Sequence, residues 1–177
     1  MRVTQVAVTA GLLVAAAGVV GAMRTATRLD RLHVRTDAAW AALDAALCRR
    51  ARAVRELDGS AALRCAVDAA LPAGSDVALR AGAAVREEVE NELGRILAVL
   101  DRHGLEPACA GQLADAEQRV VIARRVYNDA VRDTLALRSH RMVRWLRLAG
   151  TAAAPRYFEI AEPALPSYGL ELDGAGA

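Results

Sequence analysis

The most acidic stretch of this chain is also the one whose residue types could do chemistry. Residues 83–94 read Ala-Ala-Val-Arg-Glu-Glu-Val-Glu-Asn-Glu-Leu-Gly, and four glutamates fall within them: Glu87, Glu88, Glu90 and Glu92. Carboxylates that share one face of a helix can hold Mg²⁺ against a pyrophosphate, because this hard cation takes oxygen ligands in a tight octahedral geometry. Metal-dependent hydrolysis is therefore the first chemistry to consider.

The spacing within this segment argues against that chemistry. The segment is similar to the Nudix box, a helical motif that binds magnesium, but the interval from Arg86 to Gly94 is one residue too long. No matching glycine precedes it, and the chain lacks the alternating β-branched runs that would form the strands of that fold. We therefore predict that the four glutamates form a solvent-exposed acidic face and that the chain is not an enzyme.

The other reactive side chains show no catalytic or metal-binding pattern. The histidines are far apart and outside any zinc motif: His33, His103 and His140. The cysteines are odd in number, widely spaced and outside any Cys-x-x-Cys pair: Cys48, Cys65 and Cys109. The sequence has neither a Gly-x-Ser-x-Gly elbow nor a phosphate-binding glycine loop. We predict buried thiols, with no catalytic residue, metal, cofactor or small-molecule substrate.

The composition predicts an all-α protein. Hydrophobic residues make up 54% of the 177 residues and aromatic residues only 3%. The apolar mass is mostly Ala, Val and Leu, of which Ala and Leu are strong helix formers. The cationic side chains are all arginine, they alternate with acids, and the net charge is only +2. A charge so small and so mixed does not predict a nucleic-acid partner.

An apolar run near the N-terminus predicts where the protein resides. Residues 3–23 carry no charge, and about 20 helical residues cross the ~30 Å hydrocarbon core of a bilayer. A cleaved secretory signal is the alternative, with Arg2 as its basic end and residues 20–22 as a loose cleavage site. The run is longer than a typical signal core and continues into helix, so we predict a retained single-pass anchor in membrane lipid.

The arginines around this run predict its orientation. One arginine precedes it, and four follow within 12 residues: Arg24, Arg28, Arg31 and Arg35. The positive-inside rule therefore places the C-terminal domain in the cytoplasm. Within the run, small residues at spacings of four, three and four could let a second helix approach: Gly11, Ala15, Gly18 and Ala22.

Beyond the anchor, apolar stripes predict an antiparallel up-and-down helical bundle with long helices. Apolar residues recur every three or four positions along three segments: 29–57, 77–100 and 113–135. A shorter helix is expected at 60–71, and the last long helix is expected to span about 108–148. The predicted domains are an anchor, a bundle and an irregular tail: 1–23, 24–150 and 151–177.

The end of the last long helix permits two interpretations. Residues 138–148 read Arg-Ser-His-Arg-Met-Val-Arg-Trp-Leu-Arg-Leu, a basic segment with Trp145 among its apolar residues. Such a helix could lie on anionic lipid. Alternatively, its arginines face solvent while Met142, Trp145 and Leu146 pack on the bundle. The turns between the helices decide whether this end returns to the membrane.

One segment resembles the signature helix of the LemA family. Residues 116–133 read Ala-Glu-Gln-Arg-Val-Val-Ile-Ala-Arg-Arg-Val-Tyr-Asn-Asp-Ala-Val-Arg-Asp. In that family a Glu-x-Arg start leads to Ala-Arg-x-x-Tyr-Asn-x-x-Val, after an N-terminal membrane segment. The matching positions are Glu117, Arg119, Ala123, Arg124, Tyr127, Asn128 and Val131.

Two further stretches carry the same resemblance. An Ala-Trp pair and a later Leu-x-Arg-Arg sequence match the first bundle helix of the family: Ala39, Trp40, Leu47, Arg49 and Arg50. A proline followed by two aromatic residues and a glutamate matches its C-terminal part: Pro155, Tyr157, Phe158 and Glu159. A second Tyr-Asn pair is replaced around Asp133 and a proline is missing around Arg141, so the chain is similar to a divergent, actinobacterial-type member.

The resemblance implies a membrane-anchored antiparallel helical bundle of undefined biochemical activity. We expect a scaffold or protein-interaction module at the cell membrane, bound to a protein partner or to a second copy. The alternative is a regulatory or envelope-stress module that acts on a membrane enzyme. Within the motif, Arg124 and Asn128 could tie the helix to a neighbour while Tyr127 packs with its hydroxyl at the edge of the core. Alternatively, these three residues bind a partner.

Overall fold

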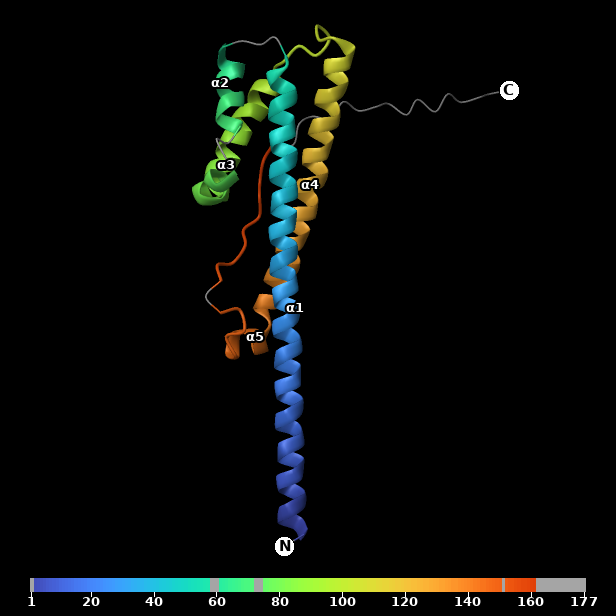
Figure 1. Ribbon diagram of the computed structural model, residues 1–177, viewed down its shortest axis with the longest axis vertical. Coiled ribbons are helices and arrows are strands. Elements are labelled where there is room, and N and C mark those ends of the chain that lie inside the picture. The colour runs from blue at the N-terminus through green and yellow to red at the C-terminus, as the bar shows by residue number, and fades with distance from the viewer. Residues whose placement is uncertain (1, 58–60, 72–74, 151, 162–177) are drawn as a thin grey trace, which may run out of the picture. The chain divides into compact units, whose positions relative to one another are not determined.

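The structure is a computed structural model that describes residues 2–57, 61–71, 75–150 and 152–161. These residues form five α-helices and no β-strand, so the prediction of an all-α protein is confirmed. Figure 1 shows the helices in chain order: α1 (Arg2–Arg55), α2 (Ala61–Ala70), α3 (Ser75–Ala98), α4 (Pro107–Ser139) and α5 (Arg141–Trp145).

The predicted anchor is the first part of one uninterrupted helix. No proline or glycine falls between residues 24 and 55, so nothing in the sequence stops α1 after the apolar run. The span that starts at Val8 is long and apolar enough to cross a membrane, with a mean hydropathy of 1.6 in an 18-residue window of which 0% is buried. The hydroxyls of Thr9 and Thr25 donate to the carbonyls of Gln5 and Gly21, at 3.0 and 2.8 Å. Such bonds satisfy hydroxyl groups where lipid offers no partner.

The chain divides into two compact units, and both draw on α1 and α4. Unit 1 consists of Met1–Ala46 and Ile122–Phe158, and unit 2 of Leu47–Val121 and Glu159–Ala177. The predicted division into anchor, bundle and tail stays a prediction.

In unit 1, α1 and the second half of α4 lie side by side and antiparallel (Figure 1). The pairs His33–Arg138 and Thr36–Thr134 establish the direction, because the number rises on α1 as it falls on α4. The buried side of each helix follows the spacing of three and four that the sequence predicts. Its apolar members are Leu29, Ala39, Leu43, Ala46, Tyr127, Ala130, Val131 and Leu137.

The last long helix ends earlier than the sequence predicts. Instead of one helix over 108–148, α4 ends at Ser139 and α5 begins at Arg141. His140 between them has φ −59° and ψ 135°, outside the helical region, so the chain turns there without a proline. The turn brings Val143 into a buried cluster with Leu29 and Leu137. Trp145 is 84% exposed, so the interpretation in which it packs on the bundle is wrong.

A compact hydrogen-bonded turn closes α5. The backbone N–H of Leu148 donates to the carbonyl of Val143 at 3.0 Å, and that of Arg147 donates to the carbonyl of Arg144 at 3.3 Å. This pair of bonds is the Schellman motif, in which one residue adopts a left-handed conformation. That residue is Arg147, with φ 50°, at a position where glycine is usual.

In unit 2, α2 and α3 pack together with the end of α1 and the first half of α4. The core is aliphatic, with Ala51, Val54, Leu63, Val67, Leu93, Leu97 and Leu113 among its buried members. The stripe predicted at 77–100 is only partly correct. Val77 and Ala81 lie outside the described side chains, and Val85 is 51% exposed. The buried positions on α3 are Arg86, Glu90, Leu93 and Leu97, at spacings of four, three and four.

Residues 152–161 form neither helix nor strand, as the sequence predicts for the start of the tail. Phe158 and Ile160 within them are nonetheless buried. The backbone N–H of Phe158 donates to Asn128 of α4, and that of Ala161, next to Ile160, donates to Asn91 of α3. The rest of the predicted tail, at 162–177, lies outside the described residues.

Candidate functional site

Three aromatic residues from separate stretches of the sequence meet in unit 1. Trp40 of α1 lies 5.3 Å from Tyr127 of α4 and 5.5 Å from Phe158, measured between ring centroids. The interplanar angles of 59° and 73° are tilted and edge-on, and aromatic pairs favour such geometry because the ring edge is positive and the face negative. This aromatic cluster therefore ties the irregular C-terminal segment to α1 and α4.

Asn128 holds the backbone of this segment beside the cluster. Its amide nitrogen donates to the carbonyl of Phe158 at 3.1 Å, and its amide oxygen accepts from the N–H of the same residue at 2.9 Å. One side chain thus bonds both polar groups of one residue, as a neighbouring β-strand would. The Tyr127 hydroxyl donates to the carbonyl of Arg156 at 2.9 Å.

Arg138 binds the start of the same segment. Its guanidinium donates to the carbonyls of Ala152 and Ala153 at 2.8 and 3.4 Å and lies 3.3 Å from the Nε2 atom of His33. Side chains of α4 therefore bond to backbone atoms at both ends of residues 152–158. Because this segment has no strand partner, these bonds do what a sheet would otherwise do for its backbone.

A buried charge cluster forms the polar centre of unit 2. Glu90 Oε2 accepts from Arg50 Nη2 at 2.6 Å, and Glu90 Oε1 lies 3.1 Å from Arg86 Nη2. Arg86 Nη1 also donates to the carbonyl of Ala70 at 2.8 Å. Arg50 and Glu90 are each only 1% exposed. The prediction that all four glutamates form an exposed face is therefore wrong for Glu90, because its carboxylate neutralises buried arginine charge.

Residues in the first half of α4 take part in two further ion pairs. Arg102 and the buried Glu117 form a bidentate ion pair with N–O distances of 2.8 and 2.9 Å. The hydrogen bond to Glu117 raises the pKa of Arg102. Arg119 and Asp115, one turn apart and both exposed, lie 2.7 Å apart. The hydrogen bond from Arg119 lowers the pKa of the Asp115 carboxyl.

The remaining motif positions are not gathered with these groups. In unit 2, Arg49 is exposed, and the exposed Glu159 donates its backbone N–H to Glu87 Oε1 at 2.8 Å. One turn along α3, Asn91 Oδ1 accepts from the N–H of Ala161 at 2.9 Å. In unit 1, Arg124 is half-buried on α4, one turn before Asn128. The structure thus places the motif residues in separate clusters instead of one site.

The described residues offer little for metal or ligand chemistry. Among them, no group of three or more His, Cys, Asp or Glu side chains could hold a metal ion. No disulfide joins the cysteines, and Cys65 is exposed, contrary to the prediction of buried thiols. A hollow of about 270 Å³ in unit 2 is lined by Val54, Arg55, Leu57, Leu63, Arg64, Val67 and Asp68. Its charged residues include a weak surface pair, Arg55–Asp68 at 3.9 Å.

Sequence reasoning missed several residues that hold these clusters together. The sequence predicted Glu90 on an exposed face and considered Arg86 only within the rejected magnesium motif. It predicted no role for Arg102 or for the pair Thr36–Thr134. A signal existed for Glu90, since it lies four residues after Arg86 and in line with Leu93 and Leu97. Comparison with known protein families, curated proteins and solved structures gave no match.

Proposed function

We propose that this chain is a single-pass membrane protein whose helical part serves as a scaffold or protein-interaction module. The continuity of α1 carries the proposal. Its apolar first part has no burial inside the protein, and the same helix continues into the packed residues that begin at Leu29. An exposed apolar helix of this length is unfavourable in water and favourable in a bilayer.

Membership of the LemA family is part of the proposal. Trp40, Tyr127, Asn128 and Phe158 come from the separate stretches that carry the resemblance, and they meet in one cluster in unit 1. A motif that shares one packing task supports a common fold more strongly than scattered identities would. We propose that this task is structural, because the side chains bond to the chain's own residues 156 and 158.

The proposed interaction surface is on the outer side of α4 in unit 1. Ile122 and Val126 are 54% and 49% exposed and lie one turn apart, so they form a small apolar face on the helix. Arg125 and Asp129 beside them are exposed and charged. A rim of charge around an apolar centre is the usual composition of a protein-binding surface. The partner is another protein or a second copy of the chain.

A fractionation experiment tests the anchor. We expect the full chain to remain with membranes after washing with high salt and to require detergent for release, because burial of residues 3–23 in lipid is not electrostatic. A variant without residues 2–23 should leave the membrane fraction. Protease treatment of intact cells and of inverted vesicles then gives the orientation, and we expect cleavage of the C-terminal domain only in inverted vesicles. A full chain found in the soluble fraction would refute the anchor.

A capture experiment tests the interaction module. The full chain is cross-linked in membranes, solubilised and purified, and the bound proteins are compared between Val126→Glu and Ala136→Glu. Both changes add a carboxylate to an exposed position of α4. We expect only Val126→Glu to lose its partner. Equal capture by both variants would contradict the proposed surface. Altered turnover of a captured membrane enzyme would favour the regulatory alternative.

A further inference from the structure

The exposed side of α5 combines apolar and basic side chains. Met142, Trp145 and Leu146 are 41%, 84% and 42% exposed, and their spacing of three and four places them on one side of the helix. The buried side belongs to Val143, so the apolar side chains on the outer surface are not needed for packing. Exposed apolar side chains that gather in one patch with a polar rim mark protein or membrane contact sites.

The charged residues in the chain segment around α5 are all basic. Arg141, Arg144 and Arg147 are exposed. No acidic residue occurs in the sequence between Asp133 and Glu159. The surface is therefore complementary to an anionic partner, and arginine binds phosphate groups well because its planar guanidinium can donate two parallel hydrogen bonds.

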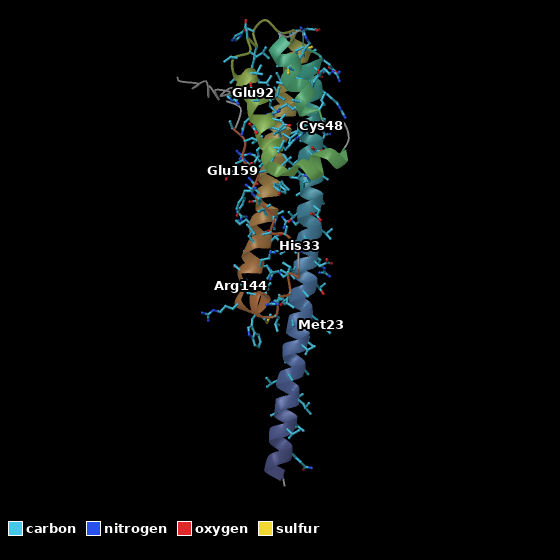
Figure 2. The ribbon with its side chains drawn as sticks, turned by 90° about the vertical axis from the view of Figure 1, so that its left-hand side faces the viewer. Met23, His33, Cys48, Glu92, Arg144 and Glu159 are labelled. Atoms are coloured by element: carbon cyan, nitrogen blue, oxygen red, sulfur yellow. The ribbon has the colours of Figure 1, made fainter. Side chains whose placement is uncertain are left out.

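Packing within unit 1 fixes where this surface lies. Val143 and Leu148 belong to one apolar cluster with Leu29 and Leu32 of α1. Leu29 follows Met23, the last residue of the apolar run, by six positions, which is about 9 Å along a helix. Figure 2 shows Arg144 beside the part of α1 that follows Met23. Since each headgroup layer of a bilayer is about 5–8 Å thick, Leu29 would lie just beyond the outer edge of that layer, within reach of the long side chains of α5.

We propose that α5 is a second membrane contact, in which Trp145 enters the headgroup layer and Arg141, Arg144 and Arg147 bind the phosphates of anionic lipid. The inference rests on the proposed anchor, because α1 brings α5 to the lipid surface. Tryptophan favours this layer, since its ring is apolar and its N–H can still reach water or a headgroup. The antiparallel pairing of α4 with α1 returns the chain to the membrane side.

The experiment measures the lipid exposure of Trp145 in the full chain, reconstituted into nanodiscs. The discs contain either phosphatidylcholine alone or phosphatidylcholine with phosphatidylglycerol, and in each set one lipid is brominated near the headgroup to quench tryptophan. The chain has two tryptophans, so Trp145→Phe gives the signal of the half-buried Trp40 alone. We expect bromolipid to quench the Trp145 signal strongly in anionic discs and more weakly in neutral ones.

A pair of charge variants separates this contact from a general charge effect. Arg141→Gln with Arg144→Gln removes two arginines from α5, whereas Arg119→Gln with Arg132→Gln removes two from exposed positions of α4. Each basic residue near an anionic surface contributes about fivefold to binding. The α5 variant should therefore lower the equilibrium constant for contact of α5 with anionic lipid roughly 25-fold, and the α4 variant should leave this constant unchanged.

Four outcomes would overturn the inference. Trp145 emission typical of water without quenching would indicate that no lipid covers α5 and that its partner is another molecule. Equal quenching in neutral and anionic discs, or equal loss in both charge variants, would refute the role of the arginines. In these cases the chain still enters the discs and the anchor stands. A chain that does not enter the discs would refute the anchor and this inference together.

Discussion

In unit 1 the fully buried polar side chains among the described residues are neutral. Thr36 and Thr134 meet hydroxyl to hydroxyl at 3.0 Å, and Asn128 bonds a backbone amide. In unit 2 the corresponding groups are charged, with Arg50 and Glu90 almost completely buried at 2.6 Å. Both units contain parts of α1 and α4, so the difference does not come from the helices that each unit uses. It comes from which side chains of these helices face the interior.

The neutral and the charged pairs differ in the stability that the protein loses when one partner is removed. A neutral group left without its partner costs about 1–3 kcal/mol, because it has lost water and gained no bond. A charge left alone in the interior costs more, about 3–5 kcal/mol. Single substitutions of the buried polar residues should therefore lower stability more in unit 2 than in unit 1. Arginine and glutamate are usually surface residues, so this sensitivity comes from their burial in unit 2.

The largest effect should come from Glu90→Gln. This change removes the carboxylate between Arg50 and Arg86, and we expect the free energy of unfolding to fall by about 3–5 kcal/mol. Urea unfolding of the detergent-solubilised chain, followed by circular dichroism, measures it. Glu88→Gln, an exposed change on the same helix, is the control. If the two variants unfold alike, unit 2 does not depend on its buried charges and the comparison fails.

A smaller loss is expected for Asn128→Ala in unit 1. The change leaves the N–H and C=O of Phe158 without their partner, which should reduce the unfolding free energy by about 2–3 kcal/mol. Hydrogen exchange at the Phe158 amide should also become faster, since its acceptor is gone. Asp129→Ala, an exposed neighbour, should alter neither quantity much. Unchanged exchange at Phe158 would contradict the role of Asn128.

Changes in the pair Thr36–Thr134 should lower the unfolding free energy less than Asn128→Ala does. Each hydroxyl oxygen also lies within hydrogen-bonding distance of the carbonyl four residues earlier in its own helix, Thr36 from Leu32 and Thr134 from Ala130, both at 2.9 Å. Thr36→Val should therefore cost about 1 kcal/mol, and adding Thr134→Val should cost little more, since replacing both partners leaves no orphaned group. A double-mutant cycle measures this coupling. Strictly additive losses would show that the two hydroxyls act independently.

The smallest effect should come from Asp115→Asn, which removes a charge at the surface of unit 2. The hydrogen bond from Arg119 lowers the pKa of Asp115 below its ordinary value of 3.8. Its stabilisation is therefore present above that value and disappears as the pH falls through the lowered pKa. We expect the variant and the parent to differ slightly at pH 7 and to converge below pH 4. A large difference at pH 7 would show that charge matters in unit 2 regardless of burial.

Much of the fold could be predicted from the spacing of apolar residues. The stripe through Leu29, Leu43 and Val54 is buried, and the helix boundaries near residues 60, 71 and 75 follow Gly, Pro and Ser signals. The end of α4 could not be predicted, because His140 leaves the helical region without a proline or glycine to mark it. Local sequence determines such a helix break only weakly, and the packing of Val143 against Leu29 and Leu137 stabilises it.

The clusters could be predicted only in part. The resemblance singled out Trp40, Tyr127, Asn128 and Phe158, yet neither spacing nor composition indicates that one amide would bond both backbone groups of Phe158. Glu90 was assigned to solvent because glutamate is rarely buried. Its burial depends on Arg50, 40 residues away, and a contact of that range leaves no periodic signal in one sequence.

The left-handed Arg147 has a consequence of its own. For a residue with a β-carbon this conformation costs about 1–2 kcal/mol, and glycine would relieve that strain. At position 147, backbone stability therefore favours glycine, whereas the proposed lipid contact requires an arginine side chain. Arg147→Gly should therefore stabilise the turn, while it removes one of the guanidinium groups of the proposed lipid contact.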